Sequence, residues 1–271
     1  MYSFFTTFRA TSPVLPGSAI TRGVQMAEYL GGRLNPEKGY EDDVCIWVKE
    51  APKPKIVEIP KCSYLDIIDS PRAESWLLTH PQMWAIALGK TQYEFFSKVL
   101  NKDRVILLPH HNCNYERIKR IDREIRTVGL IGTSDAFYYD IPDLTKRFAE
   151  LGLDFKYLQV FGKRTDVVDF YKTIDIQVLW RRPKKDRLCN PLKLTNAGSF
   201  GIPTVSYPEK SYTDEWDGYF IPALTIEELI TETCRLRDEK NYYDDMSHKV
   251  DIKAEEYHIE KISKLYENLR R

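Results

Sequence analysis

The chain has 271 residues, 42% of them hydrophobic, and its 40 basic and 40 acidic side chains cancel. At about 100 to 200 residues per domain, this length suits two compact units as well as one. A net charge of zero gives no global reason to bind nucleic acid or an acidic membrane surface, so any anion site must be local.

The chain carries no sign of a membrane span or an export signal. Its apolar runs stay below the roughly 18 residues of a transmembrane helix, and its start lacks a basic segment followed by an apolar core. The five cysteines are scattered and form no C-x-x-C pair, which argues against a disulfide framework and a structural zinc. We therefore expect a cytoplasmic protein with reduced thiols, no transmembrane segment and no nucleic-acid partner.

The first 110 residues alternate between short apolar strands and helical patterns. This alternation predicts parallel strands joined by helical crossovers. A charged stretch, "NYERIKRIDREIRT", follows at 114–127 and is expected to be a linker or an exposed helix between two domains. The expected strands are 2–8, 44–50, 64–69, 84–88 and 104–109, and the expected helices cover about 18–30, 74–78 and 91–100.

The same alternation restarts after this stretch. We expect strands at 127–132, 155–160, 174–180 and 203–207, helices at 143–152, 166–173, 191–200 and 225–240, and a charged helical tail from about 245. The simplest interpretation is an α/β protein with two doubly wound domains. Their expected ranges are 1–113 and 126–248, and the C-terminal helix of about 250–271 is able to pack back on the first domain.

The segment "NPLKLT" places a lysine close to a clearly marked helix start. Asn190 is expected to be the N-cap, Pro191 suits the first helical position, and Gly201 ends the helix. Lys193 then lies in the first turn, where the positive end of the helix dipole disfavours a cation. A bound anion would reverse that effect.

The loop before this helix is basic, since the strand 174–180 runs into "RRPKKDRLCN". In parallel α/β sheets, ligands bind beyond the carboxyl ends of the strands. The cations and the helix start therefore predict a phosphate site, with the alternative that the basic run is a solvated loop and Lys193 points to water. The cations of this loop are Arg181, Arg182, Lys184, Lys185 and Arg187.

The segment "PLKLTNAGSFGIPTVSY" resembles the donor-binding helix and following strand of nucleotide-sugar glycosyltransferases of the GT-B architecture (glycosyltransferase group 1, family 4-like), where K-L-x-E-x-x-x-x-G-x-P-V-V recurs. "TVGLIGTS", "LQVFGKRTDVVDFYKTIDIQVLW" and "DGYFIPALTIEELI" resemble other parts of the same donor domain. The first half of the chain shows a less specific resemblance, to the acceptor domain of the same family. It lies in the segments "PGSAITRGVQMAEYLG" and "YEFFSKVLNKDRVILLPHHNCN".

The resemblance implies two Rossmann-like domains facing a cleft, and transfer of a hexose-like sugar from a UDP or GDP sugar to a sugar, lipid or protein acceptor. It implies no metal and no cofactor beyond the donor substrate. Lys193, with Arg181 or Arg182, would hold the donor phosphates, and Asn196 takes the place of a glutamate that bonds the ribose. Other residues carried over to the donor site are Gly132, Thr133, Ser134, Gly162, Lys163, Asn190 and Leu194. Gly17, before a helix start at Ser18, is a further candidate for contact with the donor phosphate, with a plain turn glycine as its alternative.

Two departures from the family pattern leave other functions open. Many retaining members have two glutamates separated by seven residues, and Leu188 and Asn196 stand there in this chain. The arginine that usually follows the first strand of the donor domain is absent from "GTSDAFYYD". A catalytically silent nucleotide-sugar-binding module and a sugar-nucleotide epimerase of the same architecture are the alternatives.

The acceptor domain must supply a group that orients or deprotonates the acceptor hydroxyl. Asp69 stands where family members often carry a functional histidine, and it is the first candidate. Its alternative role is that of a helix N-cap, because "DSP" also marks a helix start. His110, beside His111 at the end of a strand, is the second candidate. No carboxylate accompanies this histidine pair at metal-ligand spacing, and the donor half has no D-x-D pair, so we expect no metal site.

Overall fold

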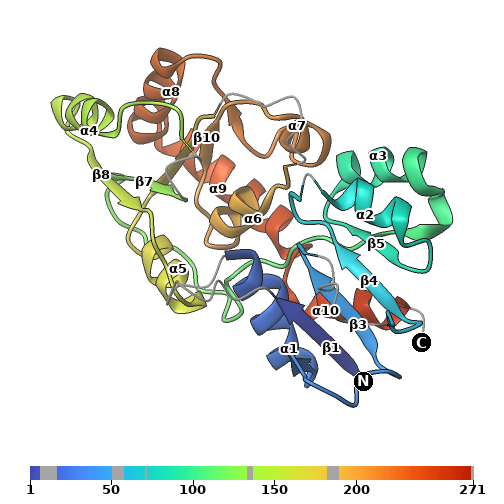
Figure 1. The fold of residues 1–271 in the computed structure, drawn as a ribbon. Helices are drawn as coiled ribbons and strands as arrows, with labels where there is room; N and C mark the ends of the chain where they lie inside the picture. Colours follow the sequence, from blue (N-terminus) through green and yellow to red (C-terminus); the bar gives the residue numbers. More distant parts are fainter. Residues whose placement is uncertain (7–16, 51–57, 71, 133–136, 182–188, 270–271) are drawn as a thin grey trace. The chain divides into compact units, whose positions relative to one another are not determined.

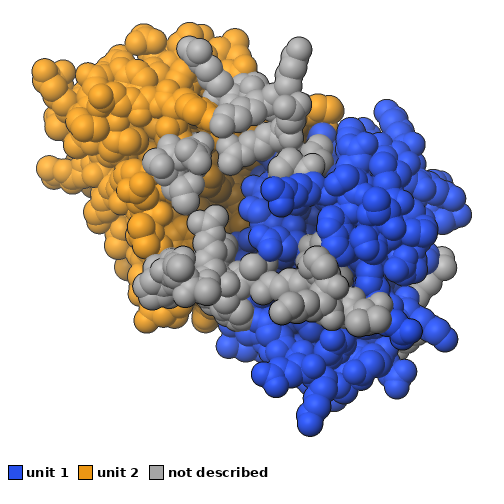
Figure 2. All heavy atoms as spheres, viewed as in Figure 1, with its two compact units in different colours: residues 1–111, 185–190, 259–271 blue, residues 112–184, 191–258 orange. Residues whose placement is uncertain are grey.

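The computed structural model describes residues 1–6, 17–50, 58–70, 72–132, 137–181 and 189–269 (Figure 1). They divide into two compact units, which Figure 2 colours blue and orange. Unit 1 comprises residues 1–111, 185–190 and 259–271, and unit 2 comprises residues 112–184 and 191–258.

Unit 1 is built on a parallel sheet. Among the described residues the sheet has six strands in the order β2-β1-β3-β4-β5-β6. The central strand β3 is buried along its whole length, as expected for a strand covered on both faces. The two-residue strand β2 was not predicted from the sequence. The strands are β1 (Tyr2–Thr6), β2 (Arg33–Leu34), β3 (Val44–Val48), β4 (Ser63–Asp66), β5 (Trp84–Ala87) and β6 (Val105–Leu107).

The helices expected in the first half are present, with one unexpected feature. The first of them starts as a π-helical turn, η1 (Ala19–Val24), and continues as α1 (Gln25–Leu30). Gly23 allows this turn to lie against β1, because a Cβ there would come within 2.2 Å of Thr6 Cγ2. The other helical segments of unit 1 are α2 (Ala73–Thr79), α3 (Lys90–Leu100), η2 (Lys102–Arg104), α10 (Ile259–Leu265) and η4 (Tyr266–Asn268).

Unit 2 has a second parallel sheet, with five strands in the order β11-β10-β9-β7-β8 in the part of the chain that is described. Helix α7 and strand β11 were not predicted. The strands are β7 (Thr127–Ile131), β8 (Asp154–Leu158), β9 (Ile176–Leu179), β10 (Thr204–Ser206) and β11 (Ile221–Pro222). The helices are α4 (Ile141–Glu150), α5 (Arg164–Tyr171), α6 (Leu192–Ser199), α7 (Lys210–Glu215), α8 (Ile226–Asp238) and α9 (Lys240–Glu255).

Helices cover both faces of this sheet. One core packs the strands against α4 and α8, and another packs them against α5 and α6. In Figure 1, α4 and α5 accordingly lie on opposite sides of β7 and β8. Helix α6 lies very close to α9, because a Cβ on Gly198 would come within 2.8 Å of the Val250 main-chain oxygen. Gly198 is thus required by packing.

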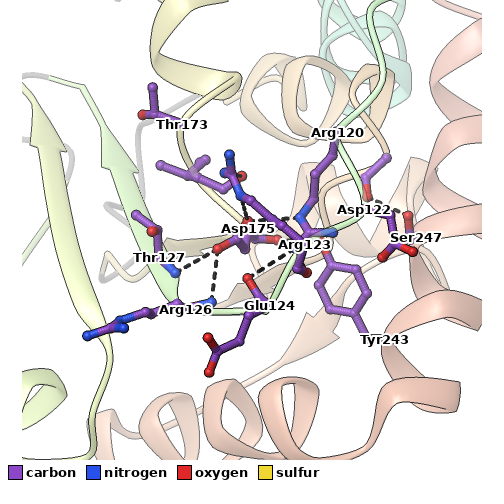
Figure 3. A network of polar contacts seen from close by, with 12 residues as sticks. Arg120, Asp122, Arg123, Glu124, Arg126, Thr127, Thr173, Asp175, Tyr243 and Ser247 are labelled. Atoms are coloured by element: carbon purple, nitrogen blue, oxygen red, sulfur yellow. Dashed lines mark hydrogen bonds and ion pairs between the residues drawn. The ribbon is translucent and has the colours of Figure 1, made fainter.

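The charged stretch 114–127 contains no helix before β7 starts at its last residue, so the linker interpretation fits its backbone and the exposed-helix one is wrong. Its C-terminal part is held at the amino end of the unit 2 sheet by the buried Asp175 (Figure 3). One carboxylate oxygen accepts from Arg120 and Arg123, and the other accepts from the main-chain N–H groups of Arg126 and Thr127. This network is structural and lies at the sheet edge opposite to the candidate site.

The two parallel sheets with alternating helices confirm the predicted α/β class. The five cysteines all lie in the described ranges, and they are not linked by disulfides there. Across the described ranges, every helix is too short or too polar to cross a membrane.

Candidate functional site

The candidate donor site lies at the carboxyl edge of the unit 2 sheet. β7, β9 and β10 are parallel neighbours, so the residues that follow them share this edge. Gly132 follows β7 directly and Trp180 follows β9, with Arg181 next in the chain. Helix α6 connects β9 to β10, so its amino end lies at the same edge.

Helix α6 begins one residue later than the sequence indicates. Pro191 occupies the N-cap position and Leu192 is the first helical residue, so the prediction of Asn190 as N-cap is wrong. The physical reason is that the Pro191 main-chain oxygen already accepts the first helical hydrogen bond, from the N–H of Thr195, at 3.0 Å. Lys193 is therefore the second helical residue, still within the turn where the helix dipole favours an anion.

The first turn of α6 is fixed by a buried glutamine that the sequence analysis did not single out. Gln177 in β9 donates from Nε2 to the main-chain oxygen of Lys193 at 3.1 Å and to Thr204 Oγ1 at 2.9 Å. Its Oε1 accepts from the Tyr171 hydroxyl at 2.8 Å. A glutamine inside the apolar strand "IDIQVLW" was the sequence signal for this network.

Asn196 has a structural partner within unit 2. Its side-chain oxygen accepts from the main-chain N–H of Cys113 at 2.9 Å, and its side chain is buried. The neighbouring Leu194 is 2% exposed and belongs to the core. Asn196 therefore anchors the segment after residue 112 to α6 through one lone pair of its side-chain oxygen.

Arg181 forms a nearly buried ion pair at the end of β9. Its guanidinium donates two hydrogen bonds to the Glu209 carboxylate, of which the Nη2–Oε2 bond measures 2.8 Å. The side chains are 12% and 5% exposed. Because this fork is bidentate, Arg181 keeps a fixed orientation and its charge is neutralised locally. Arg182, the adjacent cation, lies outside the described residues.

The other glycines of the candidate donor site lie in the turns that follow β7 and β8. Gly132 has a φ of +136°, a conformation that L side chains rarely adopt, and its N–H donates to the Leu158 oxygen. The N–H groups of Gly162 and Lys163 both donate to the Asp166 carboxylate, at 2.8 and 3.0 Å. Thr133 and Ser134 lie outside the described residues.

In unit 1, Asp69 follows β4 and pairs with Lys49, which follows β3. The Lys49 Nζ–Asp69 Oδ1 distance is 2.8 Å, and the side chains are 41% and 32% exposed. Helix α2 has Arg72 at its N-cap position, so the alternative role of Asp69 as N-cap is wrong. The N–H of Ala73 is instead bonded to the Ser70 oxygen, which moves the helix start three residues further along the chain. Asp69 remains a partly exposed carboxylate at the carboxyl edge.

His110 and His111 are buried just after β6. His111 Nε2 lies 2.8 Å from Gln25 Oε1, and His110 is 4% exposed with no hydrogen-bond partner for its Nδ1. Burial, and after it the charges of Arg22 and His111, lower the pKa of His110 well below its ordinary value. Its imidazole is therefore neutral at neutral pH. Gly17, which is half-buried, directly precedes Ser18, the N-cap of η1.

The sequence analysis also missed a buried ion pair in unit 1. Arg22 in η1 and Asp66 at the end of β4 are both fully buried and hydrogen-bonded to each other. An aspartate inside the apolar stretch "YLDIID" was the available signal. Within the described ranges, histidine, cysteine, aspartate and glutamate side chains form no group of three that could hold a metal ion.

The two parallel sheets with alternating helices match the GT-B fold of solved glycosyltransferases. The chain is similar to Anabaena Alr3699/HepE, solved in complex with UDP and glucose, with a TM-score of 0.63, 10% identity and 98% of each chain covered. It is also similar to WaaG, a glycosyltransferase involved in lipopolysaccharide biosynthesis, with a TM-score of 0.60 and 12% identity over 97% of this chain and 98% of that one.

A third similar structure is the GtfA/B complex, with a TM-score of 0.56, 12% identity and 84% of this chain covered. This chain spans only 56% of that longer chain. No family model matches the sequence, and no curated protein sequence does. At these identities the likeness shows the fold.

Proposed function

We propose that this protein is a glycosyltransferase that moves a sugar from a nucleoside diphosphate sugar to an acceptor hydroxyl. The acceptor oxygen forms a bond to the anomeric carbon, the bond from that carbon to the diphosphate breaks, and the hydroxyl proton passes to a base. The observation that carries this proposal is Lys193 in the first turn of α6, at the carboxyl edge of the second sheet of a GT-B fold. The UDP bound to HepE supports a uridine donor.

In this proposal, unit 2 binds the donor. Lys193 and the amino end of α6 stabilise the negative charge that develops on the departing diphosphate. No metal takes part in this stabilisation. Arg181 contributes less than a free cation would, because Glu209 already accepts from its guanidinium.

Unit 1 supplies the group that acts on the acceptor hydroxyl. Asp69 is the first candidate because its carboxylate is partly exposed, and His110 is the second because its imidazole is neutral. Both follow strands of one parallel sheet, β4 and β6.

The test combines binding with turnover. A ligand that binds only the native state raises the melting temperature by mass action. We expect UDP or GDP to stabilise the protein, and the matching sugar nucleotide to release its diphosphate when the acceptor is present. Binding without release would identify the silent nucleotide-sugar-binding module, and conversion of the donor without any acceptor would identify an epimerase. If no nucleoside diphosphate stabilises the protein, the proposal is wrong.

A further inference from the structure

The Arg22 guanidinium joins three segments of unit 1. Its Nε donates to Asp66 Oδ2 at 2.5 Å, and its Nη1 donates to the Pro109 main-chain oxygen at 2.8 Å. Its Cζ lies 5.6 Å from the centre of the Tyr266 ring in η4. The turn after β6, the end of β4 and the C-terminal segment of unit 1 are thus held by one buried cation.

The contact with Pro109 matters because His110 is the next residue. A hydrogen bond to the oxygen of Pro109 fixes the peptide plane that leads into His110, and so limits the positions that its side chain can take. Arg22 itself is placed by the π-helical turn η1, a rare conformation that is frequent at functional sites. Gly23, the next residue, allows this turn to pack tightly against β1.

Arg22 and Asp66 form an ion pair in which both side chains are fully buried. Replacing a buried ion pair by apolar residues of similar volume is often neutral or stabilising. A pair of this kind therefore suggests a role other than stability.

We propose that Arg22, held in place by Asp66, is a positioning residue for His110, which orients the imidazole toward the acceptor hydroxyl. This inference rests on the proposed function, in which His110 is a candidate base. The titratable or charged groups that face Arg22 in the described part of unit 1 are Asp66, His110 and Tyr266, and His111 is next to His110.

The charge of Arg22 has a second effect, on the proton affinity of His110. Burial is the largest cause of the lowered pKa of His110, and the Arg22 charge lowers this pKa further. Removal of the Arg22 charge is therefore expected to raise the pKa of His110. This shift can be measured without any substrate.

The experiment follows the imidazole signals by NMR during a pH titration of the full chain, with His110→Gln to assign the signal of His110. In the wild type, we expect His110 to titrate well below the ordinary range of a histidine. Titration of His110 within that ordinary range would overturn the proposal, and this arm needs no further variant.

The matched variant is the double substitution Arg22→Met with Asp66→Leu, which removes both charges and leaves neither partner unpaired. We expect the His110 titration to move to higher pH, because the Arg22 charge that lowers its pKa is removed. We also expect kcat to fall about tenfold or more with little change in KM, because a misplaced catalytic group slows the reaction without weakening binding. A folded double variant with the wild-type titration and the wild-type kcat would overturn the proposal.

UDP binding, measured by calorimetry on the same samples, separates this inference from the proposed function. If neither the wild type nor any variant binds a nucleoside diphosphate, the proposed function is wrong. The NMR titration of His110 would then still show whether Arg22 lowers the pKa of His110.

Discussion

Gln177 Nε2 donates a hydrogen bond to the main-chain oxygen of Lys193 at 3.1 Å, and thereby ties the first turn of α6 to the centre of the unit 2 sheet. The same amide contacts Thr204 in β10 and Tyr171 in α5. The Gln177 side chain therefore fixes the first turn of α6 relative to β10 and α5. This turn carries Lys193, the residue proposed to bind the donor phosphates.

Gln177→Met should destabilise the protein and weaken UDP binding. The methionine has a similar length but removes the hydrogen bond to the Lys193 oxygen and leaves the Tyr171 hydroxyl without its buried partner, at about 1 to 3 kcal/mol for that unsatisfied group. Urea unfolding and calorimetry measure the two effects. Thr204→Val is the matched control, because it removes one contact of Gln177 and keeps the contact with Lys193. Equal loss of affinity in both variants would contradict a role of Gln177 in placing α6.

Lys193→Ala should weaken UDP binding by about 1.5 to 3 kcal/mol, the range for hydrogen bonds to charged groups. The free protein should keep its stability, since a cation in the first turn of a helix is slightly unfavourable without a ligand. Lys172→Ala is the control, because Lys172 lies at the C-cap of α5 and pairs with Asp169. Unchanged UDP affinity of Lys193→Ala in calorimetry would return Lys193 to the role of a solvated surface lysine.

Asp69→Asn should lower turnover about a hundredfold or more if the carboxylate acts on the acceptor hydroxyl, because an amide cannot replace a base. Stability should stay near that of the wild type, since the exposed pair with Lys49 contributes little. Lys49→Gln removes the same pair and keeps the carboxylate, so it separates loss of the pair from loss of the base. Near-normal turnover of Asp69→Asn would exclude Asp69 and leave His110 as the candidate.

Donor binding and turnover should persist in the presence of a chelator. In the proposed site, Lys193 and the dipole of α6 offset the charge of the diphosphate, as a divalent cation does in other enzymes. Calorimetry with UDP, with and without chelator, measures this directly. A strict requirement for magnesium or manganese would contradict the proposed mode of donor binding.

Asp175→Asn should destabilise unit 2 by about 3 kcal/mol at neutral pH, because it leaves the buried end of Arg120 without its charged partner. Burial alone would raise the pKa of Asp175, but the N–H groups of Arg126 and Thr127 and the Arg120 guanidinium lower it below its ordinary value. The stability that this carboxylate contributes is therefore complete above the unfolded pKa of about 4 and is lost as the pH falls through the lower folded pKa.

The difference in unfolding free energy between the wild type and Asp175→Asn should shrink accordingly as the pH falls below about 4. Urea unfolding at a series of pH values measures it. Asp122→Asn is the control, since the exposed pair of Asp122 with Lys240 should contribute close to nothing. A difference that stays constant down to the acid transition would show that the charge of Asp175 is not what stabilises the network.

The sequence determined the elements and the class of fold, because both depend on local patterns. Apolar strands such as "VCIWV" and the helix that begins within "NPLKLT" are recognisable from periodicity and from the proline at the helix start, and the alternation of strands and helices predicts parallel sheets. The short elements β2, α7 and β11 were missed, since so few residues carry no period of their own.

Only the tertiary structure decided which side chains meet. The partners of Asp69, Asn196 and Arg181 are Lys49, Cys113 and Glu209, and each pair comes from segments separated along the chain. No local pattern encodes such a pair, because it forms only after the strands take their order in the sheet. The buried Arg22 and Gln177 are the clearest cases: the sequence marks them only as polar residues in apolar surroundings, and burial then requires partners that the fold alone supplies.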